Sequence, residues 1–225
     1  MEPAQKRDFK NQLYEQFARI GKALASGRRI ELLELLAQGE RSVEALASQT
    51  DLSIANASQH LQILRAAGLV EVRREGTFAF YRIAPESFAL WQSLRQVGEA
   101  RLLEIERLVS STLGERSALE PIRLDELRRR LELGEVVLLD VRPVEEFRAA
   151  HIPGARSLPI TSLEQQLATL PTGTEIVAYC RGPYCVFADE AVALLRGNGF
   201  TAHRLEAGLP DWRAAGYPVA QALAT

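Results

Sequence analysis

The stretch that decides the fold of the second half of this chain is Ile176-Val177-Ala178-Tyr179-Cys180-Arg181-Gly182-Pro183-Tyr184-Cys185-Val186-Phe187. A short apolar run ends at Cys180, a loop containing Gly182 and Pro183 follows, and helical spacing of apolar residues begins at Val186. This order predicts a strand, a loop and a helix. Backbone N–H groups and a helix N-terminus then converge on Cys180, which favours the reactive thiolate. The alternative is a small cysteine buried as a hydrophobe at a strand end.

The segments around this stretch alternate between apolar strands and amphipathic helices. We expect strands near 136–140, 155–158, 175–179 and 202–205, and helices near 124–133, 144–149, 162–169 and 187–196. This alternation predicts an α/β domain with a parallel sheet and helices on both faces. Ligands of such sheets bind beyond the carboxyl ends of the strands, and Cys180 directly follows one.

Several motifs of this half occur together and in order. They are Leu139-Asp140-Val141-Arg142-Pro143 with Glu146-Phe147, His151-Ile152-Pro153-Gly154-Ala155, the Tyr179-Cys180-Arg181-Gly182 loop, Gly208 and Trp212. With them, the region from about Pro121 to Val219 resembles the rhodanese family. The resemblance implies that Cys180 is a nucleophile, which takes sulfane sulfur from a donor such as thiosulfate. It would hold the sulfur as a persulfide and pass it to a thiol or cyanide.

The loop around Cys180 has the chemistry for this role. The loop has five backbone N–H groups that can point inward, and Pro183 supplies none. The five belong to Arg181, Gly182, Tyr184, Cys185 and Val186. The loop from Cys180 to Cys185 is short, and its size suits a sulfur atom better than a phosphate. The Arg181 guanidinium could hold an anionic sulfur donor. The resemblance places Asp140 and Arg142 in a supporting ion-pair network, and His151 in packing and hydrogen bonding.

Cys185 places a second thiol at the end of the same loop. If its Cα lies within about 7 Å of that of Cys180, the two can form a disulfide, or Cys185 can attack a persulfide on Cys180. The other interpretation is a hydrogen-bonding thiol without a redox role.

The first half has the pattern of a helix-turn-helix with a wing. Apolar residues at helical spacing predict helices near 9–24, 28–37, 43–48 and 53–67, with Ser42 and Ser53 as N-caps. The β-prone runs 70–74 and 78–83 predict a hairpin. A long helix is expected over 85–113, and it has so many apolar residues that we expect it to pack on a partner subunit.

Two motifs stand out in this half, Gly27-Arg28-Arg29-Ile30-Glu31-Leu32-Leu33 and Ser58-Gln59-His60-Leu61-Gln62-Ile63-Leu64-Arg65-Ala66-Ala67-Gly68-Leu69-Val70. With the hairpin, they make the region from Phe9 to Leu113 similar to the ArsR/SmtB winged-helix repressors. The resemblance implies a homodimer that reads an inverted repeat in double-stranded DNA. It places Asn56, Ser58, Gln59 and His60 near base edges, and Arg65, Arg73 and Arg74 near phosphates or the minor groove. The alternative is a winged helix used only for protein interactions.

Composition limits the remaining possibilities. The net charge is only −2, so DNA binding depends on a local patch. The sequence has neither a run long enough to span a bilayer nor the apolar region of a signal peptide, which predicts a cytoplasmic protein without membrane contact. Its two cysteines in a reducing compartment favour sulfur or redox chemistry. The first domain lacks the cysteine pair or carboxylate and histidine ligands of the metal-sensing relatives, and no histidine has a partner at ligand spacing, so neither a metal nor a cofactor is expected.

We therefore expect two domains: a mainly α winged helix-turn-helix over 1–113, a linker over 114–120, and an α/β rhodanese-like domain over 121–225. The function predicted is a transcriptional regulator, a repressor, in which Cys180 accepts sulfane sulfur from thiosulfate, a persulfide or a polysulfide. One alternative is a sulfurtransferase enzyme whose DNA-binding half localises it or regulates its own gene. Another is an arsenate-linked regulator that uses Cys180 and Cys185.

Overall fold

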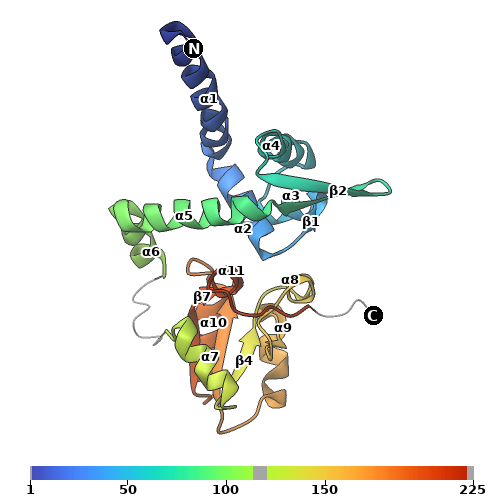
Figure 1. Cartoon of the computed structure of the whole chain (residues 1–225). Helices are drawn as coiled ribbons and strands as arrows, with labels where there is room; N and C mark the ends of the chain where they lie inside the picture. The colour runs from blue at the N-terminus through green and yellow to red at the C-terminus, as the bar shows by residue number, and fades with distance from the viewer. Residues whose placement is uncertain (1, 114–120, 222–225) are drawn as a thin grey trace. The chain divides into compact units, whose positions relative to one another are not determined.

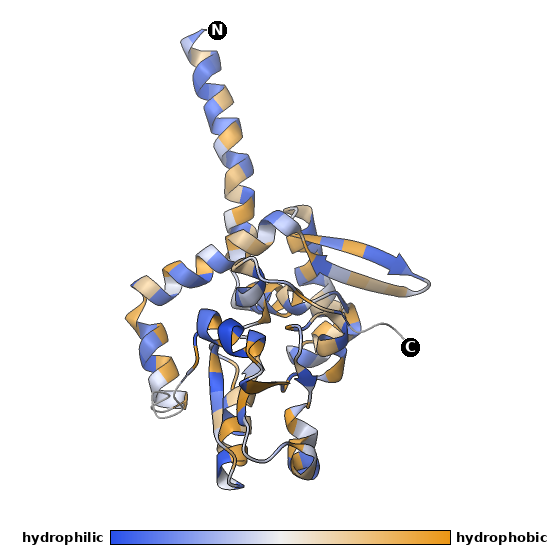
Figure 2. Cartoon of the chain, turned by 60° about the horizontal axis from the view of Figure 1, so that its bottom comes forward, coloured by the Kyte–Doolittle hydropathy of each residue, from blue (hydrophilic) through white to orange (hydrophobic). Residues whose placement is uncertain are grey.

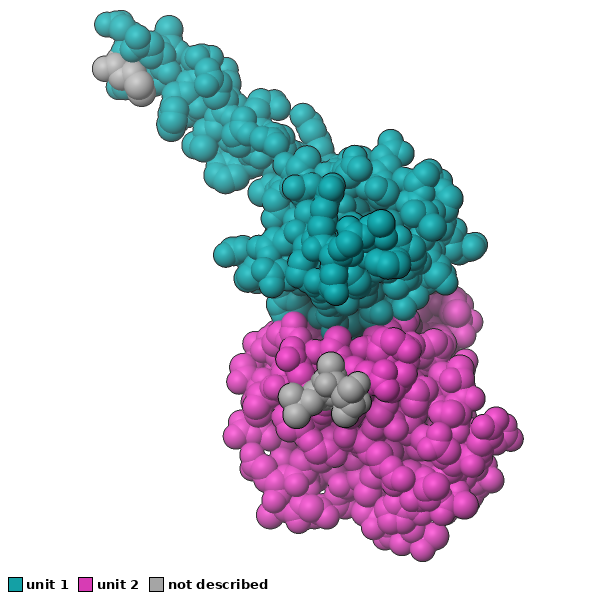
Figure 3. All heavy atoms as spheres, turned by 90° about the vertical axis from the view of Figure 1, so that its right-hand side faces the viewer, with its two compact units in different colours: residues 1–96 teal, residues 97–225 magenta. Residues whose placement is uncertain are grey.

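The computed structural model describes residues 2–113 and 121–221. The chain divides into two compact units, residues 1–96 and residues 97–225 (Figure 3). The predicted linker, residues 114–120, lies outside the described residues.

The N-terminal part of the chain is helical with one small sheet (Figure 1). Its elements are α1 (Pro3–Leu24), α2 (Gly27–Gln38), β1 (Arg41–Ser42), α3 (Val43–Gln49), α4 (Ile54–Ala66), β2 (Val70–Glu75), β3 (Phe78–Ile83), α5 (Pro85–Arg101) and α6 (Leu103–Leu113). The sheet is antiparallel with strand order β1-β3-β2. The predicted hairpin is confirmed, and β1 adds a short third strand that the sequence did not predict.

Local signals explain where the helices of the helix-turn-helix begin. The Ser42 Oγ accepts a hydrogen bond from the Ala45 N–H, and the Ser53 Oγ accepts one from the Asn56 N–H, each at 3.2 Å. Both serines are therefore N-caps, as predicted. On α4, Ala57, Leu61 and Leu64 are fully buried in the core of this unit. That burial turns the opposite face of α4 outward.

The expected single helix over 85–113 is wrong in one respect, because it breaks at Leu102 into α5 and α6. Gly98 lies close to the start of α6, since a Cβ at position 98 would lie 3.2 Å from Cδ1 of Ile105. The apolar spacing continues through the break, which is why periodicity alone did not reveal it.

The second unit contains a parallel sheet with the strand order β5-β4-β6-β7. Its elements are α7 (Leu124–Glu132), β4 (Val136–Asp140), α8 (Val144–Ala149), β5 (Arg156–Ser157), α9 (Ile160–Gln166), a 3-10 turn (Leu167–Thr169), β6 (Glu175–Cys180), α10 (Phe187–Gly197), β7 (Ala202–Gly208) and α11 (Leu209–Ala214). The predicted α/β fold is confirmed. The short helix α11 was not predicted.

Alternation along the central strand β6 divides the core between the two faces of the sheet. Ile176, Ala178 and Cys180 belong to the core on the side of α9 and α10. Val177 and Tyr179 belong to the opposite core, with α7 and α11. Every side chain from 176 to 180 is thereby buried, as expected for an inner strand covered on both sides. This burial fixes the position at which the chain leaves the sheet after Cys180.

Candidate functional site

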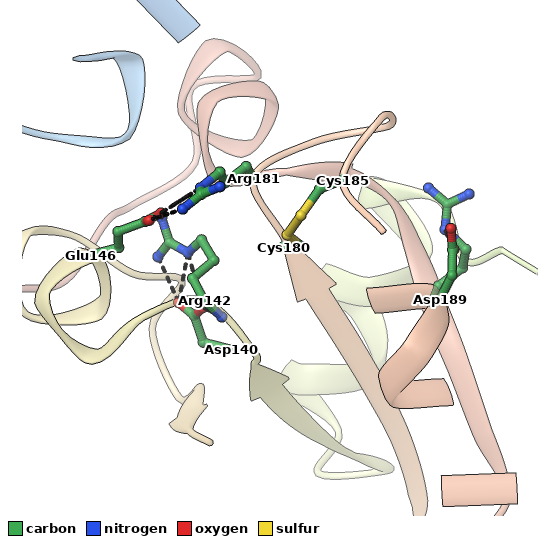
Figure 4. Close-up of a disulfide and its surroundings, with 8 residues drawn as sticks. Asp140, Arg142, Glu146, Cys180, Arg181, Cys185 and Asp189 are labelled. Atoms are coloured by element: carbon green, nitrogen blue, oxygen red, sulfur yellow. Dashed lines mark hydrogen bonds and ion pairs between the residues drawn. A yellow bond between two sulfur atoms is a disulfide. The ribbon is translucent and has the colours of Figure 1, made fainter. Parts of the chain in front are cut away.

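Cys180 is the last residue of β6 and is 1% exposed. Its Sγ is bonded to the Sγ of Cys185, and the two Cα atoms are 6.2 Å apart (Figure 4). The structure therefore brings together the two thiols that the sequence predicted could meet. The loop between them leads directly into α10, which begins at Phe187.

The backbone of the loop is held from two sides. The Cys185 N–H donates to the Gly182 carbonyl oxygen at 3.2 Å, which closes a turn within the loop. On the other side, Gly208 lies directly against the Arg181–Gly182 peptide. A Cβ at position 208 would meet the Arg181 carbonyl oxygen and would lie 2.6 Å from the Gly182 nitrogen. Glycine at 208 is thus required by space, because a side chain would displace the loop that carries Cys180.

Arg181 is engaged by a carboxylate of its own protein. Its Nη2 donates to Oε1 of Glu146 at 2.6 Å, and its Nε donates to the same oxygen at 3.1 Å. In Figure 4 the Arg181 side chain points toward Glu146 and away from the Cys180–Cys185 bridge. Glu146 belongs to α8 and is 1% exposed. The positive charge of Arg181, which the sequence analysis assigned to an anionic sulfur donor, is therefore compensated by Glu146 in this structure.

Asp140 and Arg142 form a fully buried ion pair at the end of β4. Nη2 of Arg142 donates to Oδ2 of Asp140 at 2.6 Å and to the Ala150 carbonyl oxygen at 2.8 Å. Burial disfavours the charged guanidinium, but the hydrogen bonds and charge of Asp140 outweigh it and raise the pKa of Arg142 above its ordinary value. Nη1 of Arg142 also lies 3.9 Å from Oε2 of Glu146. A chain of charges thus runs from Asp140 through Arg142 and Glu146 to Arg181.

Tyr179 joins this network from the strand that carries Cys180. Its hydroxyl donates to Oδ2 of Asp140 at 2.5 Å and accepts a hydrogen bond from the Ile152 N–H at 3.1 Å. Burial, and after it the charge of Asp140, raises the pKa of Tyr179 well above its ordinary value of 10.0. Tyr179 is therefore a neutral hydrogen-bond donor that links β6 to β4.

The remaining predicted residues of this half have plainer surroundings. Nδ1 of His151 lies 2.8 Å from the Phe147 carbonyl oxygen, and its ring stacks on that of Phe147 with centroids 3.8 Å apart. These contacts are the packing and hydrogen bonding expected of it. Tyr184 is half-buried and Val186 is at the border of exposure, with 36% of its surface accessible.

The predicted DNA-contacting residues of α4 lie on its outer side. Asn56, Gln59 and Arg65 are exposed, while Ser58 and His60 are half-buried. Exposed amide side chains can pair with base edges, and an arginine at the helix end can reach a phosphate. Three of these five side chains are therefore accessible, while Ser58 and His60 are less exposed than the sequence led us to expect.

The two wing arginines differ in their surroundings. Arg73 donates from Nη2 to Glu40 and from Nη1 to Glu75, each at 2.6 Å, and its guanidinium lies 4.7 Å from the centre of the Phe80 ring. Arg74 follows on β2 and is exposed. The charge of Arg73 is therefore compensated within the wing.

The described residues, 2–113 and 121–221, contain neither a cluster of metal ligands nor a membrane-spanning helix. No group of three or more His, Cys, Asp or Glu residues there is arranged to hold a metal ion. No described helix has the length and hydropathy needed to span a bilayer.

Comparison with known proteins agrees with both folds. Residues 26–72 match the family model described as bacterial regulatory protein, arsR family, and residues 123–215 match the rhodanese-like domain. The chain is 49% identical over 213 residues to the HTH-type transcriptional regulator Rv0324 of Mycobacterium tuberculosis, covering 94% of this chain and 93% of that protein.

Two further relatives are similar to the DNA-binding part of this chain over most of their own length. The uncharacterized HTH-type transcriptional regulator Rv0081 of Mycobacterium tuberculosis is 41% identical over 92 residues, which is 40% of this chain and 81% of that protein. The solved winged helix-turn-helix domain of Mb0332 from Mycobacterium bovis, described as homodimeric, is 49% identical. It covers 41% of this chain and 87% of that one, with a TM-score of 0.40.

These findings define the class of protein as a winged helix-turn-helix regulator with a rhodanese-like domain after it. The chain belongs to the ArsR family of transcriptional regulators.

Three residues of the site were not assigned a role from the sequence. Glu146 and Gly208 stood in the quoted motifs, and Tyr179 preceded the cysteine, but none was predicted to hold the loop. The spacing of Arg142 and Glu146, four residues apart at the start of a predicted helix, was a usable signal for their proximity. Nothing in the sequence indicated that Gly208 meets the Arg181–Gly182 peptide.

Proposed function

We propose that this regulator binds double-stranded operator DNA as a homodimer, and that sulfane sulfur accepted on Cys180 changes its affinity for the operator. The observation that carries the proposal is the position of Cys180. It follows the carboxyl end of an inner strand of a parallel sheet, in a short loop that leads into α10. This is where α/β sheets bind their ligands, and a cysteine before a helix N-terminus is a favoured nucleophile.

The DNA-binding part of the proposal rests on the accessible side chains of α4 and the wing. Asn56 and Gln59 are amide side chains suited to adenine edges, and Arg65 and Arg74 are exposed cations suited to phosphates. Because the net charge of the chain is −2, these local cations rather than the whole surface supply the attraction to DNA.

The homodimer is supported by the apolar side chains that α1 leaves exposed. Phe9, Tyr14 and Phe17 are 58%, 64% and 60% accessible, which is unusual for large aromatic residues. Figure 2 shows apolar residues recurring along this helix. A second copy of the chain that covers them gains about 25 cal/mol for each Å² of apolar surface removed from water.

The proposed donor is a thiol persulfide rather than a dianion such as thiosulfate or an inorganic polysulfide. Arg181, the cation beside Cys180, is already bound by Glu146. A dianion entering the loop would have to compete with that buried carboxylate, whereas a donor with less charge needs no such compensation.

The test is operator affinity in defined sulfur states of Cys180. The operator is selected by the protein itself from random duplexes, and binding is followed by fluorescence anisotropy at fixed salt, since phosphate contacts make affinity salt-dependent. Reduced protein, persulfidated Cys185→Ser and Cys180→Ser are compared, with intact mass giving the sulfur content of each. The expected result is a shift of at least about tenfold, or roughly 1.4 kcal/mol, which Cys180→Ser abolishes.

A different result would change the assignment. If Cys180 accepts sulfur and passes it to a thiol or to cyanide with steady turnover while operator affinity stays constant, sensing is refuted. The protein is then a sulfurtransferase that its DNA-binding half localises.

A further inference from the structure

Cys185 has no part in the uptake of sulfur proposed above, yet its sulfur lies in bonding contact with that of Cys180. We propose that Cys185 is a resolving thiol, which reduces the sulfane sulfur on Cys180 to hydrosulfide and leaves the Cys180–Cys185 disulfide. This inference rests on the proposed function, because it begins from a persulfide on Cys180. It assigns the protein a further activity, the dithiol-dependent reduction of sulfane sulfur.

The reaction is an exchange at the inner sulfur of the persulfide. The Cys185 thiolate, having lost its proton to solvent, attacks the Cys180 Sγ. A bond forms between the two cysteine sulfurs, and the bond from the Cys180 Sγ to the outer sulfur breaks. The outer sulfur, which carries the proton of the persulfide, leaves with the bonding electron pair as hydrosulfide. It gains two electrons, and each cysteine sulfur loses one, so no other oxidant or reductant is needed.

The structure favours attack by Cys185 over attack by a thiol from solvent. In the disulfide-bonded form Cys180 is 1% exposed, so little of its sulfur is open to solvent. Cys185 belongs to the same loop, its Cα lies 6.2 Å from that of Cys180, and the turn closed by its N–H to the Gly182 carbonyl fixes its position. Holding two reacting groups this way replaces a bimolecular encounter by an intramolecular step.

The site of attack determines the product. If Cys185 attacked the outer sulfur instead, the persulfide would move from Cys180 to Cys185 and no hydrosulfide would form. Attack at the inner sulfur matches the bond present in the structure, which joins the two Sγ atoms. The disulfide then blocks Cys180 until a dithiol reductant converts both cysteines to thiols and is itself oxidised to a disulfide. A loaded Cys180 would thus be a transient state rather than a lasting one.

The experiment uses the full-length chain, reduced and freed of small thiols, and treated with a small excess of a low-molecular-weight thiol persulfide. Samples are quenched with an alkylating agent at successive times and weighed intact, while hydrosulfide is trapped with a bimane reagent. For the wild type we expect the mass of one added sulfur to give way to the loss of two hydrogens, with one hydrosulfide released per chain above the Cys180→Ser blank. Cys185→Ser and Cys185→Ala should keep the added sulfur and release none.

Glu190→Gln is the matched control, since Glu190 is exposed on α10 and close in sequence to Cys185. It should behave as the wild type. The inference is overturned if the wild type keeps the added sulfur as long as the Cys185 variants do, a result that leaves sulfur uptake on Cys180 intact. It is also overturned if no variant takes up sulfur, and in that case the proposed function fails as well.

Discussion

Nη2 of Arg181 lies 2.6 Å from Oε1 of Glu146, so the cation of the cysteine loop is held by a buried carboxylate on α8. Glu146 is also within 3.9 Å of Arg142, which is itself paired with Asp140. The loop is in this way tied to a helix about 35 residues earlier in the chain. Its position therefore depends on a network of charges rather than on its own residues alone.

Glu146→Gln is expected to destabilise the rhodanese-like unit by about 3 kcal/mol, because it leaves the Arg142 and Arg181 guanidinium groups without their shared carboxylate. Glu145→Gln, the exposed neighbour on the same helix, should change stability by less than about 0.5 kcal/mol. The measurement is urea denaturation followed by the fluorescence of Trp212 in a Trp91→Phe background, since Trp91 and Trp212 are the two tryptophans of the chain. Equal stability of the two variants would refute the role of the network.

Gly208→Ala is expected to slow sulfur uptake on Cys180 by about a hundredfold, because the added methyl group displaces the Arg181–Gly182 peptide. Gly197→Ala is the control, since a Cβ there meets nothing within 4 Å. Uptake is measured in a Cys185→Ser background, where the added sulfur is kept, as the rate at which intact protein gains one sulfur from a persulfide donor. Circular dichroism verifies that both variants are folded, and uptake at the wild-type rate in Gly208→Ala would contradict the prediction.

The alkaline stability of the rhodanese-like unit should depend on Tyr179. Its pKa in the folded state lies well above 10.0, so the folded protein keeps the phenol proton where the unfolded chain loses it. The contribution of Tyr179 to the free energy of unfolding is therefore complete below about pH 10 and is lost as the pH rises further. Tyr179→Phe should cost about 1–3 kcal/mol at neutral pH and weaken the alkaline decline. Urea denaturation from about pH 8 to about pH 11 measures the loss of stability and its dependence on pH. If stability falls with rising pH as steeply in Tyr179→Phe as in the wild type, Tyr179 is not the group responsible.

The two wing arginines should contribute unequally to DNA affinity. Arg74→Gln is expected to lower affinity for a duplex of random sequence and to reduce the slope of log affinity against log salt by about one per subunit. Arg73→Gln should change the slope less, because Glu40 and Glu75 already compensate its charge. Anisotropy titrations at several salt concentrations compare the two variants. If Arg73→Gln reduces the salt slope more than Arg74→Gln does, the prediction is wrong, and Arg73 leaves Glu40 and Glu75 to contact DNA.

Replacing exposed aromatic residues of α1 should dissociate the proposed homodimer. Phe9→Glu with Phe17→Glu removes two side chains whose burial is worth about 1.5–3 kcal/mol each and introduces charges into the contact. Sedimentation equilibrium should then show a monomer, while circular dichroism remains as in the wild type. The control is Lys10→Glu on the same helix, and a double variant that stays dimeric would place the contact elsewhere.

Much of the fold was predictable because its signals are local. The strands 136–140 and 175–180 are short apolar runs, and Ser42 and Ser53 mark helix starts through hydrogen bonds within three residues. The break at Leu102 was missed because no proline marks it and the apolar spacing continues through it. The helix α11 was not predicted either.

The sequence by itself determined the two folds and their order, the placement of Cys180 at the end of a strand, and the outward face of α4, because apolar periodicity and turn residues are read within one element. Only the tertiary structure decided that Arg181 is bound by Glu146, that Gly208 supports the loop, and that the sulfurs of Cys180 and Cys185 meet. These contacts depend on how α8, β7 and the loop pack together in space. Side-chain partners that are far apart in the chain, or joined only by the path of a loop, leave no periodic pattern in the sequence.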